Sequence, residues 1–238
     1  MNRNFILDVH THTLASGHAY GTISEMALAA AEAGLKLLGI SEHGPGIPGT
    51  TDPFYYTNLE AVPPQLYGVE LINGCEINVL NGGKLSLDED SIKWLDYALV
   101  GIHTLCYQDE GIAGNTKNVI ECMKHPMVFF VSHPDDGNTP LDYEALVSAA
   151  KEYHVALEVN NSSLRKLNSR KNVIENYQTM LSLCQEKRVP IIVNTDAHFP
   201  TAVGNFDLAY RLLEQVDFDE DLILNNDLDK FKAFLGQK

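Results

Sequence analysis

The chain has 238 residues, with 17 Lys or Arg against 32 Asp or Glu, so its formal net charge at pH 7 is −15 when the nine histidines count as neutral. Hydrophobic residues make up 45% of the chain and charged residues 21%, which is typical of a globular protein and excludes a disordered one. A surface this acidic repels phosphate backbones and anionic headgroups, which argues against nucleic acid and membrane surfaces as partners.

The sequence predicts a cytoplasmic protein. Its N-terminus has no basic flank followed by an apolar stretch, so no signal peptide is expected. The longest purely apolar run, Met127–Val131, is far too short to span a bilayer. The four cysteines contain no CxxC pair and are expected to be buried thiols in a reducing compartment. The sequence allows a homo-oligomer and leaves the number of subunits open.

Seven short apolar runs along the chain are predicted to be strands. Several are almost continuously apolar, as in Met127–Val131, which is typical of parallel strands buried on both faces. In chain order the predicted strands are Phe5–His10, Leu37–His43, Val69–Ile77, Ala98–His103, Met127–His133, Val155–Asn160 and Val189–Asp196.

Amphipathic segments between these runs predict helices, for example Ser24–Ala33 and Asp142–Tyr153. Strands that alternate with helices indicate an α/β fold with right-handed crossovers, and seven strands over this length favour a barrel over an open sheet. The segment Pro45–Pro64 is predicted to be a long loop, and Leu222–Leu235 a helix that closes the outside of the barrel. No linker divides the sequence, so residues 1–238 are expected to form one domain.

Histidines and carboxylates fall at the ends of six of the seven predicted strands. The first strand ends in a His-x-His pair, and the last ends in Asp-x-His, so in each case two side chains two residues apart share a face. The spacing is 33 residues from His43 to Glu76, 27 from Glu76 to His103 and 30 from His103 to His133. Each spacing is close to one strand–helix unit of about 30 residues. Parallel strands of a barrel present their C-terminal ends on one face, where we expect these side chains to converge.

Convergent imidazoles and carboxylates predict a metal site. Both are ligands that suit Zn²⁺, Mn²⁺ or Fe, and the number of candidates is too large for one tetrahedral ion and sufficient for two or three. Glu76 and Asp196 are the natural bridging candidates because a carboxylate can bind two cations. The nine candidates are His10, His12, His18, His43, Glu76, His103, His133, Asp196 and His198.

The sequence resembles the PHP family, named for polymerase and histidinol phosphatase, and within it the YcdX-type phosphatases. The motifs that carry the resemblance appear in order over residues 5 to 205: Asp8-Val9-His10-Thr11-His12-Thr13, Glu42-His43, His103, Ser132-His133-Pro134, Glu158-Val159-Asn160-Asn161-Ser162-Ser163 and Asn194-Thr195-Asp196-Ala197-His198. The resemblance implies a distorted TIM-like (β/α)₇ barrel with a trinuclear centre, usually zinc.

The resemblance also implies how the nine candidates divide among three divalent metal ions, with zinc expected and manganese or iron as alternatives. The first ion would be held by His10, His12, Glu76 and Asp196. Glu76 would bridge to a second ion on His103 and His133. The third ion would be held by His18, His43 and His198. All nine positions are filled, so a degenerate and inactive copy is not indicated.

The expected activity is hydrolysis of a small phosphorylated metabolite. Bound metal lowers the pKa of water toward ~7, and paired ions can clamp the phosphoryl oxygens in an in-line displacement. A hydroxide that bridges the first two ions is the expected nucleophile. Asp8 is expected either to accept a hydrogen bond from a ligand imidazole or to be a buried structural acceptor.

Four cations stand within seven residues just after the sixth strand, and two of them, Arg165 and Arg170, are candidates to bind the substrate phosphate. The same cluster also fits a solvated surface. Two other functions are also compatible with the sequence. One is metal-dependent hydrolysis of an amide or ester, and the other is a non-catalytic metal-binding or scaffold module.

Overall fold

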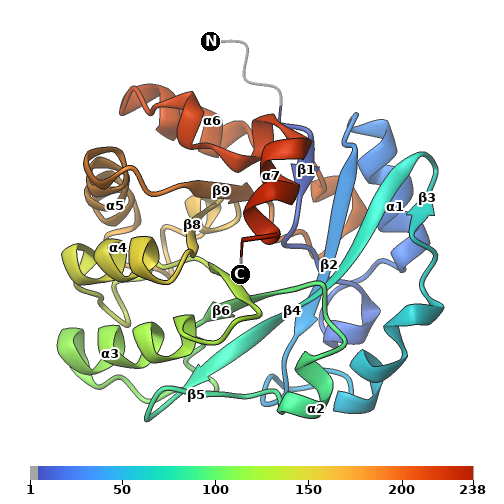
Figure 1. Ribbon diagram of the computed structural model, residues 1–238, viewed down its shortest axis with the longest axis horizontal. Helices are drawn as coiled ribbons and strands as arrows, with labels where there is room; N and C mark the ends of the chain where they lie inside the picture. The colour runs from blue at the N-terminus through green and yellow to red at the C-terminus, as the bar shows by residue number, and fades with distance from the viewer. Residues whose placement is uncertain (1–4, 238) are drawn as a thin grey trace.

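Seven parallel strands form a nearly closed barrel in the computed structural model, which describes residues 5–237 (Figure 1). Neighbouring strands follow the order β1-β2-β4-β6-β7-β8-β9, so each strand pairs with the next one along the barrel. The prediction of a barrel is therefore confirmed. The strands are β1 (Leu7–Asp8), β2 (Leu37–His43), β4 (Val69–Leu80), β6 (Tyr97–Gly101), β7 (Val128–Val131), β8 (Ala156–Asn160) and β9 (Ile191–Asn194).

Helices cover the outside of the barrel, with α3, α4, α5 and α6 in sequence along one side and α1 on the other (Figure 1). Two short strands, β3 (Gln65–Leu66) and β5 (Lys84–Leu85), pair antiparallel with β4. The predicted loop after β2 contains a 3₁₀ helix, Pro53–Ala61. The helices are α1 (Ile23–Glu32), α2 (Glu89–Ile92), α3 (Gly111–Met123), α4 (Tyr143–Glu152), α5 (Val173–Lys187), α6 (Asp207–Gln215) and α7 (Leu228–Leu235).

The barrel closes at a seam between β1 and β9 that has little strand pairing. One isolated parallel bridge joins Thr11 to Ala197. Below it, the buried amide of Asn225 spans the seam. Its oxygen accepts from the backbone N–H of Val193 at 2.7 Å, and its nitrogen donates to the carbonyls of Val193 at 2.6 Å and Leu7 at 2.9 Å. A single side chain from the C-terminal segment thus supplies hydrogen bonds that a strand pair would otherwise make.

The interior of the barrel is filled by large apolar side chains. Tyr97 is fully buried there, and its hydroxyl donates to the carbonyl of Val9 at 2.7 Å. The ring fits because Gly39 and Gly74 lie against it. A Cβ at Gly39 would come within 2.1 Å of the Tyr97 hydroxyl oxygen, and one at Gly74 within 2.5 Å of its ring. The core is therefore solid, as in other barrels of this type.

Helix α7 closes the N-terminal end of the barrel. Figure 1 shows it in front of the ring of strands, and Phe231 and Phe234 pack into the same cluster as the interior residues Phe130 and Leu99. The ring of Phe231 stacks on that of Phe130 with centroids 6.2 Å apart. The prediction of a helix on the outside of the barrel was wrong, because an apolar stripe on a helix does not specify which surface it packs against.

The part of the chain that the structure describes, residues 5–237, contains no helix with the length and apolarity needed to cross a membrane.

Candidate metal centre

Eight of the nine predicted side chains lie at or after the C-terminal ends of barrel strands, and the ninth, Glu76, lies within β4, four residues before its end. His10 and His12 follow β1, His43 ends β2, and Glu76 lies beside it on β4, where the two residues are register partners. The remaining residues follow β6, β7 and β9, and His18 follows a 3₁₀ turn after β1. The short parallel strands end at one level, so residues far apart in sequence meet in one cluster.

Glu76 lies at the centre of this cluster, and its two carboxylate oxygens face different histidines. Oε2 is 2.8 Å from His43 Nδ1, 3.3 Å from His10 Nε2 and 3.6 Å from His12 Nε2. Oε1 is 2.8 Å from His133 Nε2 and 3.4 Å from His103 Nε2. Burial raises the pKa of the Glu76 carboxyl, but the surrounding imidazoles outweigh burial and hold that pKa well below its usual range.

Asp196 forms the second carboxylate of the cluster. Its Oδ1 is 3.3 Å from His12 Nε2, 3.7 Å from His10 Nε2 and 3.3 Å from His198 Nδ1. Its backbone has φ of +52°, an uncommon conformation for a residue other than glycine and one that is often found at functional sites. Burial raises the pKa of this carboxyl, but the neighbouring imidazoles, that of His10 first, and the ammonium group of Lys166 outweigh burial and hold this pKa well below its usual range.

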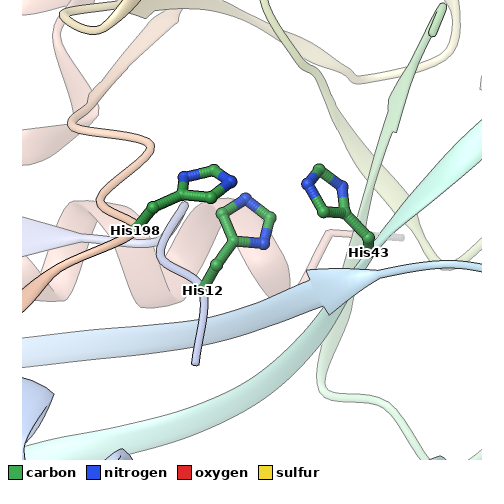
Figure 2. A group of neighbouring side chains, drawn as sticks. All are labelled: His12, His43 and His198. Atoms are coloured by element: carbon green, nitrogen blue, oxygen red, sulfur yellow. The ribbon is translucent and has the colours of Figure 1, made fainter. Parts of the chain in front are cut away.

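A third group of imidazoles lies beside this pair of carboxylates. Figure 2 shows His12, His43 and His198 gathered from three separate segments of the chain, and one ligand atom of each lies within 4.8 Å of the others. His18 completes the group from the solvent side. Its ring centroid is 4.8 Å from that of His43, and its Nε2 is 3.2 Å from His198 Nε2.

Hydrogen bonds at Nδ1 leave the Nε2 atoms of His10, His103 and His198 available to face the cluster. His10 Nδ1 is 2.7 Å from Glu158 Oε1, and His103 Nδ1 is 2.8 Å from Asn78 Oδ1. His198 Nδ1 is 3.0 Å from the carbonyl of Asp196. Acceptors at Nδ1 fix the tautomer with a bare Nε2, which is the form that binds a metal.

His12 is held in the same way by a relay of two residues. Its Nδ1 is 3.0 Å from the hydroxyl of Ser16, which donates in turn to Glu42 Oε2 at 2.5 Å. Burial, together with the charge of His43, holds the pKa of the His12 imidazole well below its usual range, so the ring is neutral and able to act as a ligand.

Four buried polar atoms in the cluster have no partner in hydrogen-bond geometry, although two of them, His43 Nδ1 and Glu76 Oε2, lie 2.8 Å apart. The four are Nε2 of His10, Nε2 of His12, Nδ1 of His43 and Oε2 of Glu76. Buried polar atoms are nearly always paired, and leaving one unpaired costs about 1–3 kcal/mol. Four such atoms within one shell of nitrogen and carboxylate donors fit divalent cations, which bind these ligand types and need no hydrogen bond.

Of the two roles expected for Asp8, the structure supports the buried structural acceptor. Asp8 accepts from the backbone N–H and hydroxyl of Thr195 and from the backbone N–H of His10, and within residues 5–237 no hydrogen bond joins it to an imidazole nitrogen. The carboxylate that orients a candidate ligand is Glu158, which belongs to one of the sequence motifs but had no role assigned to it. A buried glutamate within the apolar strand β8 was the available signal.

A cleft of about 380 Å³ opens beside the third group of imidazoles. Arg165 and Lys166 line it, and Lys166 Nζ is 3.7 Å from Asp196 Oδ2. Arg170 does not line the cleft. Its Nη1 is 3.4 Å from Oδ1 of the buried Asp135, and this pair ties the loop after β8 to the loop after β7.

The PHP domain family model matches residues 8–232. The chain belongs to the PHP domain family. A probable phosphatase of Clostridium acetobutylicum is 38% identical over 235 residues, which cover 98% of this chain and 96% of that relative. A probable phosphatase of Thermoanaerobacter sp. is 39% identical over 235 residues, which cover 98% and 95%.

The histidinol phosphate phosphatase of Lactococcus lactis, solved with zinc, L-histidinol and phosphate, has a similar structure. Its TM-score is 0.62 at 13% sequence identity, over 90% of this chain and 94% of that one. At this identity the likeness concerns the fold, which this PHP protein shares. The predictions of the family, of the barrel and of a phosphatase-type hydrolase are confirmed.

Proposed function

We propose that this PHP protein hydrolyses a small phosphate monoester at a trinuclear centre of divalent metal ions. The observation that carries the proposal is the set of four unpaired buried ligand atoms around Glu76, at the open end of a barrel. The whole chain, residues 1–238, would act as one domain. The proposed ligands are His10, His12, His18, His43, Glu76, His103, His133, Asp196 and His198.

The geometry supports a division of these ligands into three sets. Glu76 Oε2 and Asp196 Oδ1 both approach His10 and His12, which would form the first set. Glu76 Oε1 faces His103 and His133, the second set. His18, His43 and His198 would form the third. Imidazole with carboxylate suits Zn²⁺, which we propose first, with Mn²⁺ and Fe as alternatives.

When bound, divalent ions supply water of lowered pKa and positive charge for the phosphoryl group. The chain's own residues do the positioning. Glu158 and Ser16 hold the rings of His10 and His12 with Nε2 directed into the cluster. Lys166, with its ammonium group beside Asp196, would donate to a phosphoryl oxygen at the edge of the cluster.

The cleft supports a small phosphorylated metabolite as substrate. Its volume of about 380 Å³ lies at the small end of the range for ligand pockets, and Arg165 adds a second cation to its wall. Arg170 is a structural residue in this proposal because its guanidinium is paired with Asp135 inside the protein.

Glu76→Gln is the experiment that tests the proposed function. The variant keeps the size of the side chain and removes the charge that would join the first two sets of ligands. We expect bound metal to fall, and phosphate release from 4-nitrophenyl phosphate to drop more than the 10–100-fold typical of residues that only orient ligands. Metal content by plasma mass spectrometry and phosphate release are the measurements.

Glu70→Gln is the matched control, since Glu70 lies on the same strand and pairs with Lys232 at the surface. It should leave both quantities unchanged. Retention of metal and of chelator-sensitive phosphate release by Glu76→Gln would contradict the proposal. A wild-type protein that hydrolyses 4-nitrophenyl acetate and no phosphate ester would point to an ester or amide hydrolase.

A further inference from the structure

The cleft beside His18 and His198 is lined by more cationic than anionic side chains. It is lined by Arg165 and Lys166, from the turn after β8, and by Phe199, which is 51% exposed. Lys166 reaches Asp196 and the cluster, whereas Arg165 is a separate cation of the lining. The cleft therefore has room and charge beyond what a single phosphoryl group needs.

Arg165 has an exposed side chain that forms no ion pair with any residue from 5 to 237. Arg170 and Arg188, by contrast, are paired with Asp135 and Asp219. The chain carries 32 acidic residues against 17 basic ones, so acidic partners are abundant. A guanidinium left unpaired at the wall of a cleft in such a protein is available to an anionic ligand.

Within the lining of the cleft, Asp196 is the one carboxylate among the described residues, and it is directed at the imidazoles. It is 6% exposed and approaches His12 and His198. A cationic group on a substrate would therefore find no free anion in the cleft and would meet Arg165 and Lys166 instead. The apolar faces of Phe199 and Ala202 would cover an uncharged part of the substrate.

We propose that Arg165 is a specificity-determining residue that binds a second anionic group, carried by the leaving group of the substrate. The inference rests on the proposed function and adds a substrate class to it. The preferred substrates are phosphate monoesters whose leaving group has an apolar body and bears a carboxylate or a second phosphate. Esters of amino alcohols, whose leaving groups are cationic, are disfavoured.

Aryl phosphates that differ only in the charge of the leaving group test the proposal. The set is phenyl phosphate, 4-carboxyphenyl phosphate, 1,4-phenylene bisphosphate and 4-(aminomethyl)phenyl phosphate. kcat/KM is measured for wild type, Arg165→Met and Lys171→Met. Lys171 is the matched control because it lies exposed in the same loop and does not line the cleft. Differences in intrinsic reactivity cancel when each substrate is compared between variants.

The quantity compared is the ratio of kcat/KM for an anionic substrate to kcat/KM for phenyl phosphate. We expect this ratio to be about tenfold higher in wild type and in Lys171→Met than in Arg165→Met. The carboxylate and bisphosphate arms show which anion fits. Metal content should be unchanged in Arg165→Met, and kcat/KM for phenyl phosphate should fall less than kcat/KM for the anionic substrates. If the preference is the same in wild type and Arg165→Met for both anionic substrates, the proposal is overturned and the phosphatase function stands.

A binding measurement separates this proposal from the proposed function. Calorimetry with benzylphosphonate and 4-carboxybenzylphosphonate needs no turnover. We expect the carboxylate to tighten binding to wild type by about tenfold relative to Arg165→Met. This result without hydrolysis of any ester would support the anion subsite and overturn only the proposed function. Equal effects of the carboxylate on both proteins, or no binding of either phosphonate, would overturn the subsite.

Discussion

The two ends of the barrel are built from the same strands but differ in whether their buried polar atoms are paired within the protein. At the N-terminal end, Phe231 and Phe234 of α7 fill the opening, and Asn225 uses its oxygen and its nitrogen in hydrogen bonds across the seam. At the C-terminal end, the buried ligand atoms of His10 and Glu76 have no hydrogen-bond partner. The first end has its polar groups paired within the protein, whereas the second has buried ligand atoms that the proposed cations would satisfy. Stability and metal binding should therefore respond to changes at different ends.

Phe231→Ala, at the closed end, should have the largest effect on stability. Phe231 is fully buried against Phe130, and truncation of a buried phenylalanine costs about 3–5 kcal/mol. We expect the free energy of unfolding in urea to fall by this amount both with metal and after chelation. Phe54→Ala, at a site that is 75% exposed, is the control and should change it by less than about 0.5 kcal/mol. Loss of metal by the folded Phe231→Ala protein would contradict the claim that the two ends act independently.

Glu158→Gln should weaken metal binding at the open end. Glu158 accepts from His10 Nδ1 and from the backbone N–H of His133, both at 2.7 Å, so it orients candidate ligands of two sets. Gln keeps the shape but removes the charge, and we expect metal affinity to fall about 10–100-fold in competition with a chelator. Glu152→Gln, on an exposed turn of α4, should leave affinity unchanged. Unchanged affinity in Glu158→Gln would show that the charge of Glu158 does not matter for metal binding.

Ser16→Ala should have a smaller effect of the same kind. The hydroxyl accepts from His12 Nδ1 and from the backbone N–H of His43, but it is neutral and contacts only one candidate ring. We expect metal affinity to fall by roughly tenfold or less, at the lower bound for residues that orient ligands. Ser148→Ala, exposed on α4, serves as the control. A greater loss in Ser16→Ala than in Glu158→Gln would reverse the order proposed for these two supports.

The convergence of the candidate ligands could be predicted from the sequence because it follows from strand order. The spacings from His43 to His133 match successive strand–helix units, and parallel strands end on one face. In the structure, the register of β2 and β4 places Glu76 beside His43. In contrast, the contact between His10 and Glu158 joins residues 148 positions apart, across the inside of the barrel. No local pattern indicates which buried carboxylate meets which ring.

The closed end was harder to predict for a related reason. Apolar residues at helical spacing in Leu222–Leu235 predicted a helix, and α7 (Leu228–Leu235) is one. Its packing partners are Phe130 and Phe129 of the distant strand β7, so its place at the end of the barrel depends on tertiary contacts. Likewise, no sequence pattern distinguishes Arg165 from Arg170. In the structure, Arg170 is paired with the buried Asp135, whereas Arg165 lines the cleft.

The metal content of the purified protein decides whether the open end of the barrel holds three divalent ions, as proposed. The protein would be incubated with excess Zn²⁺, freed of unbound metal by gel filtration and measured by plasma mass spectrometry against protein concentration. We expect close to three ions per chain. A value of two or fewer would contradict the trinuclear centre, and a value below one would contradict the metal site itself.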